Sequence, residues 1–180
     1  MRTTLSDASC SIARTMDIIG DGWTALILRD VFAGITRFEQ FQQDLDVSRK
    51  LLAARLDRLV AEGILERRRY SKHPPRYGYV PPEKGAELFP VIAAIMRWGD
   101  HWTAGPAGPP ALIRHETCGA HTTGEVICDH CGEPLKLHDV TTEAGPGGRT
   151  GTRTRVLGPL LASRRAEPNE HDPGSGTALN

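Results

Sequence analysis

SRKLLAARLDRLVAEG, residues 48–63, is the stretch that decides the fold of this 180-residue chain. Ser48 can cap a helix with its hydroxyl, and leucines then recur at i, i+4 and i+7 on one face. Gly63 ends the helix, because glycine readily takes the left-handed conformation found after helix ends. The pattern predicts a helix whose leucine face packs inward and whose basic residues project outward.

A two-stranded ribbon is predicted directly after this helix. Residues 64–70, ILERRRY, and residues 76–80, RYGYV, have the composition of short strands. Residues 71–75, SKHPP, have the composition of a turn. The unit is therefore a helix followed by a wing.

Basic charge is concentrated in this unit. Residues 48–80 carry nine Lys and Arg against three Asp and Glu, although the whole chain has no net charge. An α-helix fits the major groove of DNA, and cations on a nearby loop neutralise phosphates. The pattern therefore indicates binding to duplex DNA; the alternative is an ordinary amphipathic helix and hairpin with solvated charges.

Helices are also predicted upstream. Residues 10–19 and 23–33 show helical spacing of apolar residues, separated by Gly20-Asp21-Gly22. Thr36 and Glu39 form a predicted capping box for a third helix. A tight turn joins this helix to the one at Ser48, which is the helix-turn-helix arrangement, with the second helix as the reader. The residues expected to point inward are Trp23, Leu26, Ile27, Val31, Phe38, Phe41 and Leu45.

A long apolar helix is predicted after the wing, over residues 83–103. Its stripe is too apolar to face water alone, and Pro90 predicts a kink or break within it. We expect this helix to pair with its copy, and with the first helix, in a two-fold dimer. The alternative is that the stripe only packs on its own domain. The stripe residues are Leu88, Ile92, Ile95, Gly99 and Trp102.

Composition divides the chain into five segments. A flexible N-terminus (1–9) precedes a DNA-binding and dimerisation domain (10–103) and a Gly/Pro linker (104–111). A cysteine module (112–140) and a disordered tail (141–180) follow, with a possible turn of helix at 157–161. No internal repeat is evident. The chain shows neither a secretory leader nor an apolar run of membrane-spanning length, so a cytoplasmic location is expected.

The cysteine module has the ligand spacing of a metal site, His115-x2-Cys118-x9-Cys128-x2-Cys131. Two close pairs of nitrogen and sulfur ligands suit tetrahedral zinc, so we expect structural zinc in a zinc-ribbon-like module. His121 or His130 could replace His115. A redox dithiol or unligated cysteines are the alternatives. Four protein ligands leave no position for an activated water, so no catalysis is expected here.

Several of these motifs together resemble the HxlR-type winged helix-turn-helix transcriptional regulators, within the broader MarR-like class. The resemblance covers about residues 10–102 and implies a mainly α fold with a small β wing (α+β). It implies a homodimer that binds a pseudo-palindromic operator near promoters and regulates neighbouring genes, as a repressor in our interpretation. The motifs are Cys10 followed by Ile12 and Arg14, then Ile18–Arg29, Arg37-Phe38, Ser48–Leu56, Pro74–Tyr79, Glu83-Lys84-Gly85 and Trp98-Gly99.

Cys10 precedes the first predicted helix, where the positive end of the helix dipole favours a thiolate. Arg14, one turn on, would add positive charge. The resemblance implies that a cysteine here senses oxidants or electrophiles. The alternative is a small residue packed at a dimer seam.

The sequence thus predicts a dimeric DNA-binding regulator that is not an enzyme. The alternative is a protein-interaction adaptor that keeps the winged-helix shape and a structural zinc module without reading DNA. An enzyme is disfavoured because no nucleophile elbow, phosphate loop or paired carboxylates occur. The predicted DNA-binding residues are Ser48, Arg49, Lys50, Ala53, Arg55, Arg58, Arg67, Arg69, Lys72, His73 and Arg76.

Overall fold

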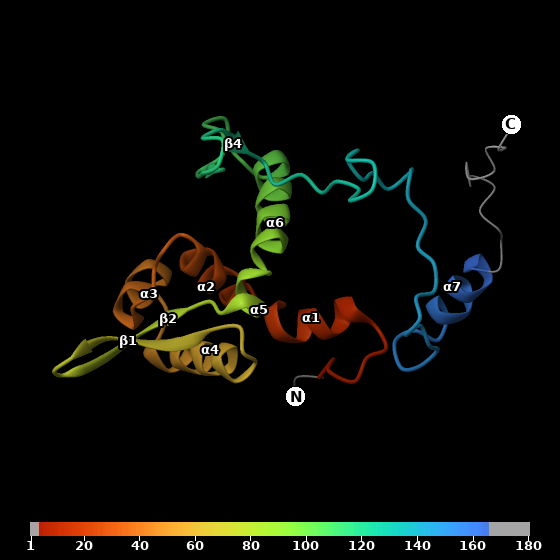
Figure 1. The fold of residues 1–180 in the computed structure, drawn as a ribbon. Coiled ribbons are helices and arrows are strands. Elements are labelled where there is room, and N and C mark those ends of the chain that lie inside the picture. Colours follow the sequence, from red (N-terminus) through yellow and green to blue (C-terminus); the bar gives the residue numbers. More distant parts are fainter. Residues whose placement is uncertain (1–3, 166–180) are drawn as a thin grey trace, which may run out of the picture. The chain divides into compact units, whose positions relative to one another are not determined.

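The computed structural model describes residues 4–165 and divides them between two compact units. One unit consists of residues 18–135, and the other of the described residues on either side of it. Figure 1 colours the chain from red at the N-terminus to blue at the C-terminus and labels most of its helices and strands. Among residues 4–165, no helix has the length and apolar character that crossing a membrane requires.

The two N-terminal helices are separated at the predicted glycine-rich stretch. Helix α1 is Ser11–Ile19 and α2 is Gly22–Phe32. Asp21 caps α2, because its carboxylate accepts hydrogen bonds from the Thr24 amide at 3.1 Å and the Thr24 hydroxyl at 2.5 Å. Asp21 therefore satisfies both the amide and the hydroxyl of Thr24 in the first turn of α2.

The predicted inward face of α2 is partly wrong. Ile27 and Val31 are buried as expected, whereas Trp23 and Leu26 are 40% and 36% exposed. Thr24 and Leu28 complete the buried face, with positions 24, 27, 28 and 31 following i, i+3, i+4 and i+7. This spacing turns the two exposed residues onto the flank of the helix.

Helix α3 (Phe38–Leu45) begins one residue later than the predicted capping box requires. The N-cap is Arg37, whose amide donates to Gln40 Oε1 at 3.2 Å. The predicted pairing of Thr36 with Glu39 is therefore wrong. The Thr36 carbonyl instead accepts from the Tyr79 amide at 2.7 Å, which ties the start of α3 to the wing.

Helix α4 (Arg49–Ala61) has the predicted boundaries. The Ser48 hydroxyl accepts a hydrogen bond from the Leu51 amide at 3.2 Å. Asp46 takes a left-handed conformation (φ 47°) in the turn between α3 and α4, and Gly63 takes one (φ 68°) after α4. The helix-turn-helix geometry is thus built from two short helices and a three-residue turn.

The wing consists of β1 (Glu66–Lys72) and β2 (Pro75–Val80), which pair antiparallel with an irregularity between Arg69 and Ser71. The predicted five-residue turn is wrong, because pairing continues to Lys72 and Pro75. Proline is tolerated there as the first residue of an edge strand. The predicted strand start at residue 64 is also wrong, since Ile64 and Leu65 are buried core residues that precede β1.

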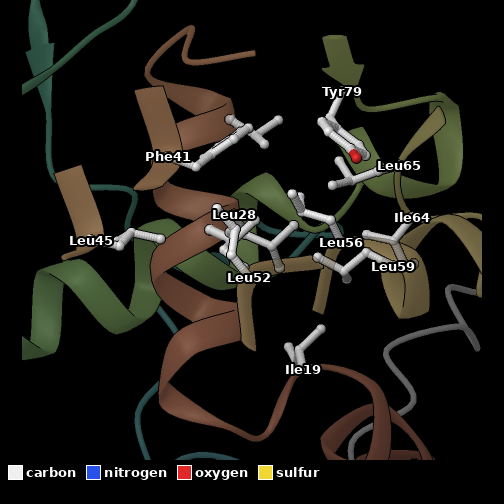
Figure 2. Packing of buried hydrophobic residues seen from close by; sticks show 12 residues of the cluster. Ile19, Leu28, Phe41, Leu45, Leu52, Leu56, Leu59, Ile64, Leu65 and Tyr79 are labelled. Atoms are coloured by element: carbon white, nitrogen blue, oxygen red, sulfur yellow. The ribbon is translucent and has the colours of Figure 1, made fainter. Parts of the chain in front are cut away.

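One hydrophobic core holds these elements together (Figure 2). Leu28 of α2 and Leu52 of α4 lie together at its centre, and Phe41 and Tyr79 meet edge to face with ring centroids 6.3 Å apart. Leu52, Leu56 and Leu59 of α4 are at most 1% exposed, as their spacing predicts. The core members are Ile19, Ile27, Leu28, Val31, Phe41, Leu45, Leu52, Leu56, Leu59, Ile64, Leu65 and Tyr79.

The apolar stretch after the wing is broken near Pro90, as predicted, into α5 (Glu83–Ala86) and α6 (Phe89–Trp102). The proline lies in the first turn of α6, where a missing N–H removes no helical hydrogen bond. Helix α6 is fixed to α2 by an edge-to-face contact between Phe89 and Phe32, with ring centroids 5.5 Å apart. Gly85 is required because a Cβ there would collide with the Ile64 carbonyl.

The C-terminal part contains more order than predicted. The cysteine module has a two-stranded ribbon, β3 (Ile113–Arg114) with β4 (His121–Thr122), and an isolated bridge between Ile127 and Pro134. The disorder predicted for the tail is wrong for α7 (Leu157–Arg165), which begins at the turn of helix expected there. The predictions for residues 1–3 and 166–180 lie outside the described residues.

Candidate functional site

The candidate site is the outward face of α4 together with the wing. Opposite the buried leucines, α4 exposes Lys50, Ala54 and Asp57. Ser48 is also exposed, although its hydroxyl is engaged as the cap. Ala53, which the sequence analysis placed in the DNA-binding set, is half-buried. A small residue at position 54 leaves this face free of bulk between the two charged positions.

Arg49 is exposed but braced against α3. Its guanidinium lies 4.9 Å from the centre of the Phe38 ring, and its Nη1 donates to Gln42 Oε1 at 3.3 Å. These contacts fix where the cation sits at the start of α4. Lys50 is exposed and has no hydrogen-bond or ion-pair partner within residues 4–165, so its ammonium group can meet an external anion.

Arg55 is placed differently from the other predicted DNA-binding residues. Its side chain is only 25% exposed, and its Nε lies 3.2 Å from Asp21 Oδ1 in an orientation that makes no directed hydrogen bond. The cation therefore neutralises the carboxylate that caps α2. Arg58 is half-buried on the same helix. We assign Arg55 to stabilising the junction of α2 and α4 and leave it out of the interface.

The wing presents its cations in two ways. Arg67 donates to Asp57 on α4 at 2.6 Å, so it ties the wing to α4 and neutralises the carboxylate on that helix's outward face. Arg69, Lys72 and Arg76 are exposed and make no hydrogen bond or ion pair with another described residue. The exposed His73 lies in the turn between the strands.

Arg37 was missed by the sequence analysis. It is exposed at the start of α3, and its guanidinium lies 4.8 Å from the centre of the Tyr70 ring on β1. It therefore adds a cation between the helix-turn-helix and the wing. A single arginine before a helix gives no charge cluster in the sequence, and only the Arg37-Phe38 motif marked the position.

Helix α2 carries a buried carboxylate. Asp30 is 2% exposed, and its Oδ1 accepts two hydrogen bonds from Arg29, at 2.8 and 2.6 Å. Within the described residues its other oxygen has no hydrogen-bond partner. Burial raises the pKa of this carboxyl above its usual value, and the Arg29 guanidinium only partly offsets that effect.

The cysteine module places its candidate ligands in two pairs. Cys118 Sγ lies 3.4 Å from His115 Nδ1 in the first pair. In the second pair, hydrogen bonds from the amides of Cys131 and His130 lower the pKa of the Cys128 thiol. His121 lies on β4. Across residues 4–165, no three His, Cys, Asp or Glu side chains gather closely enough to hold one metal ion.

The module packs on α6 through the segment between these pairs. Glu125 accepts from Arg97 at 2.8 Å, and a Cβ on Gly124 would lie 3.0 Å from the Ala93 Cβ. A cavity of about 710 Å³ lies between α6 and residues 109–126, and Trp98 and Trp102 line part of it. The module is thus attached to a helix that exposes several large apolar side chains.

Cys10 lies directly before α1 and is half-buried. The guanidinium of Arg14 donates to the Ala8 carbonyl at 2.8 Å and to the Ser11 hydroxyl at 3.1 Å. Its hydrogen bonds therefore secure the N-terminal turn.

Comparison with known proteins gives a consistent picture. The family model described as HxlR-like helix-turn-helix matches residues 18–106. The chain is 43% identical over 137 residues to the uncharacterized HTH-type transcriptional regulators Mb3122 of Mycobacterium bovis and Rv3095 of Mycobacterium tuberculosis. That match covers 76% of this chain and 87% of each relative. A Synechocystis HTH-type regulator, sll1512, is 35% identical over 94 residues, which is 52% of this chain and 70% of its own length.

Two solved structures share the fold. The structure of PA1607, described as a candidate transcription factor, is 34% identical with a TM-score of 0.70 and covers 79% of this chain and 100% of its own. The structure of PA1374 of Pseudomonas aeruginosa, also described as a candidate transcription factor, is 34% identical with a TM-score of 0.54. It covers 82% of this chain and 100% of its own. A 137-residue stretch of a 180-residue chain must include residues 112–135. The similarity to the mycobacterial relatives therefore extends through the cysteine module.

Proposed function

Because the chain belongs to the HxlR-like helix-turn-helix family of transcriptional regulators, we propose that it binds duplex DNA through α4 and the wing. The observation that carries this proposal is the free, outward-facing Lys50 on a helix whose opposite face is fixed in the core. A rigid helix with a cation on its outer face fits the major groove. The exposed cations of the wing would meet the flanking phosphates.

The proposed assembly is a homodimer on a pseudo-palindromic operator. Helix α6 exposes Ile95 by 53%, Trp98 by 63% and Trp102 by 69%, which is more apolar surface than an isolated helix face usually leaves in water. A second copy of this helix would cover that surface. Two-fold symmetry would then present two copies of α4 to two half-sites. A dimer bound near a promoter would act as a repressor by excluding polymerase.

The test is binding of the full chain to the intergenic DNA beside its own gene, measured by fluorescence anisotropy over a range of salt concentrations. We expect affinity to fall steeply with salt, because phosphate contacts release counterions. The adaptor alternative predicts binding that is absent or insensitive to salt. Either of those results would overturn the proposed DNA binding.

Substitution of Lys50 tests the reading face directly. We expect Lys50→Ala to weaken binding by about tenfold, the loss of one charged contact in the groove. Lys136→Ala is the matched control, since it removes the same charge from an exposed position outside α4 and the wing. Equal losses in both variants would indicate a general charge effect and would contradict a specific role for α4.

Regulation by oxidants through Cys10 is a further part of the proposal. Its support is the position of this half-buried thiol directly before α1, where modification would disturb the start of the helix. We expect an oxidant to release wild-type protein from the operator and to leave Cys10→Ser bound. Release of the serine variant at the same oxidant concentration would remove Cys10 as the sensor while leaving DNA binding intact.

A further inference from the structure

The cysteine module is an internal structural repeat that the sequence analysis did not detect. Residues 113–122 and 126–135 are two hairpins offset by 13 positions. Each contains the pattern ligand-x-x-Cys-Gly, with His115 and Cys118 in the first hairpin and Cys128 and Cys131 in the second. The repeat is weak in sequence because histidine replaces cysteine at the first position and the strand residues differ.

The backbone hydrogen bonds of the two hairpins correspond one to one. In the first, the His115 amide donates to the Ala120 carbonyl at 2.8 Å, and the Gly119 amide donates to the His115 carbonyl at 2.8 Å. In the second, the Cys128 amide donates to the Glu133 carbonyl at 2.8 Å, and the Gly132 amide donates to the Cys128 carbonyl at 2.9 Å. The same turn is therefore built twice.

The strands that lead into these turns also correspond. Arg114 pairs with His121 in the first hairpin as Ile127 pairs with Pro134 in the second. Gly119 and Gly132 have φ values of +72° and +78°, a conformation that favours glycine. Two independent turns of arbitrary function would have no reason to share hydrogen bonds, glycine position and the spacing of sulfur or nitrogen ligands.

The ligand pair of the first hairpin already has the separation that zinc requires. Zinc–sulfur and zinc–nitrogen bonds of about 2.3 and 2.0 Å at a tetrahedral angle place the two ligand atoms about 3.5 Å apart. Cys118 Sγ and His115 Nδ1 are 3.4 Å apart. In the second hairpin, Cys128 and Cys131 stand at the equivalent positions of the same hydrogen-bonded turn.

We propose that the two hairpins close on one zinc ion bound by His115, Cys118, Cys128 and Cys131. Only residues 123–125 separate the hairpins, and this segment is the part held on α6 by Glu125 and Gly124. Closure therefore brings the second pair to the first by a pivot at a short, anchored connection. Zinc would fix both ends of the segment that packs on α6.

The chemistry of the donor set favours zinc. Three thiols lose their protons when the metal binds, and the neutral imidazole completes a tetrahedral site with one net negative charge. Arg114 Nη2 lies 3.8 Å from the position that a Cβ on Gly119 would occupy. The guanidinium therefore stands beside the ligand turn and can offset that negative charge. A redox dithiol would need only Cys128 and Cys131, and it would leave the equivalent pair His115 and Cys118 in the first hairpin unexplained.

The test is metal analysis of the full chain purified without chelator. We expect about one zinc per chain, with bound zinc reduced roughly tenfold or more in Cys118→Ser, Cys128→Ser, Cys131→Ser and His115→Ala after dialysis against a competing chelator. His121→Ala and His130→Ala are the matched controls and should keep their zinc. Loss of zinc from a control but not from His115→Ala would overturn the ligand set.

A second measurement on the unmodified protein does not depend on the variants folding. Zinc should protect Cys118, Cys128 and Cys131 from alkylation while Cys10 reacts. After a chelator is added, these three cysteines should be alkylated as well. Alkylation of Cys118 at the same rate with and without chelator would overturn the proposal. So would a Cys128–Cys131 disulfide in protein purified without chelator, because oxidised sulfurs cannot serve as thiolate ligands.

Discussion

Asp30 shows how one buried residue shapes the behaviour of the protein with pH. Its carboxyl is buried on α2, and one of its oxygens lacks a hydrogen-bond partner within the described residues. Desolvation disfavours the ionised form, so the pKa is raised in the folded state from an ordinary value of 3.8. Above that ordinary value the unfolded chain releases this proton more readily than the folded chain does. The group therefore opposes folding increasingly as pH rises through this range.

Replacing Asp30 with asparagine should remove this opposition. We expect Asp30→Asn to gain stability relative to wild type as pH rises from about 3.5 to about 6, because the neutral amide has no proton to lose. Urea unfolding at several pH values measures the difference. A constant difference between Asp30→Asn and wild type would contradict the raised pKa.

The sequence predicted some residues of the site well and others poorly, for physical reasons. The Ser48 cap and the α4 leucines depend on local spacing, and the structure confirms both. The ion pair of Arg55 with Asp21 joins residues 34 positions apart, and no local pattern encodes such a pairing. Arg37 was missed for the same reason, because its partner Tyr70 lies on β1, which follows α3 and α4 in the chain.

At the scale of elements, the wing is longer than its composition suggested. Prolines at 74 and 75 indicated a broad turn, but Pro75 opens β2 and Arg76 pairs with Ser71. This pairing places Lys72 and Arg76 on adjacent strands near the end of the ribbon. Both cations are therefore held together at the part of the wing that extends furthest from the core.

Removing these two cations should change the salt dependence of DNA binding. Each phosphate contact contributes about 0.9 to the slope of log K against log salt. We expect Lys72→Ala/Arg76→Ala to reduce the slope by about 2. Arg68→Ala is the control, because that arginine is already paired with Glu66 at 2.8 Å. A slope equal to that of wild type would exclude the wing tip from phosphate contact.

At the scale of the whole molecule, the family and its fold could be predicted from local motifs, whereas the module and the tail could not be described in full. Short hairpins with few apolar residues carry weak periodicity, so the repeat of residues 113–135 became visible only from its hydrogen bonds. Helix α7 was underestimated because its preceding turn is stabilised locally. The Thr154 hydroxyl donates to the Arg149 carbonyl at 3.1 Å there.

The proposed dimer can be tested on α6. Trp98→Glu places a charge where apolar surface would be covered, so we expect the dimer to dissociate at micromolar concentration in sedimentation velocity. Leu137→Glu makes the same kind of change at a residue that is 94% exposed and lies outside α6, and it should leave the dimer intact. A wild-type protein that sediments as a monomer at the same concentration would remove the dimer from the proposal.

The contact of Phe32 with Phe89 gives α6 a fixed direction relative to the helix-turn-helix. In a symmetric pair of subunits, that direction sets how far apart the two reading helices stand. The half-sites of an operator must be separated by about one turn of DNA, roughly 34 Å, for both helices to enter their grooves. The Phe32–Phe89 contact, although it touches no nucleotide, would thus determine which separation between half-sites the protein accepts.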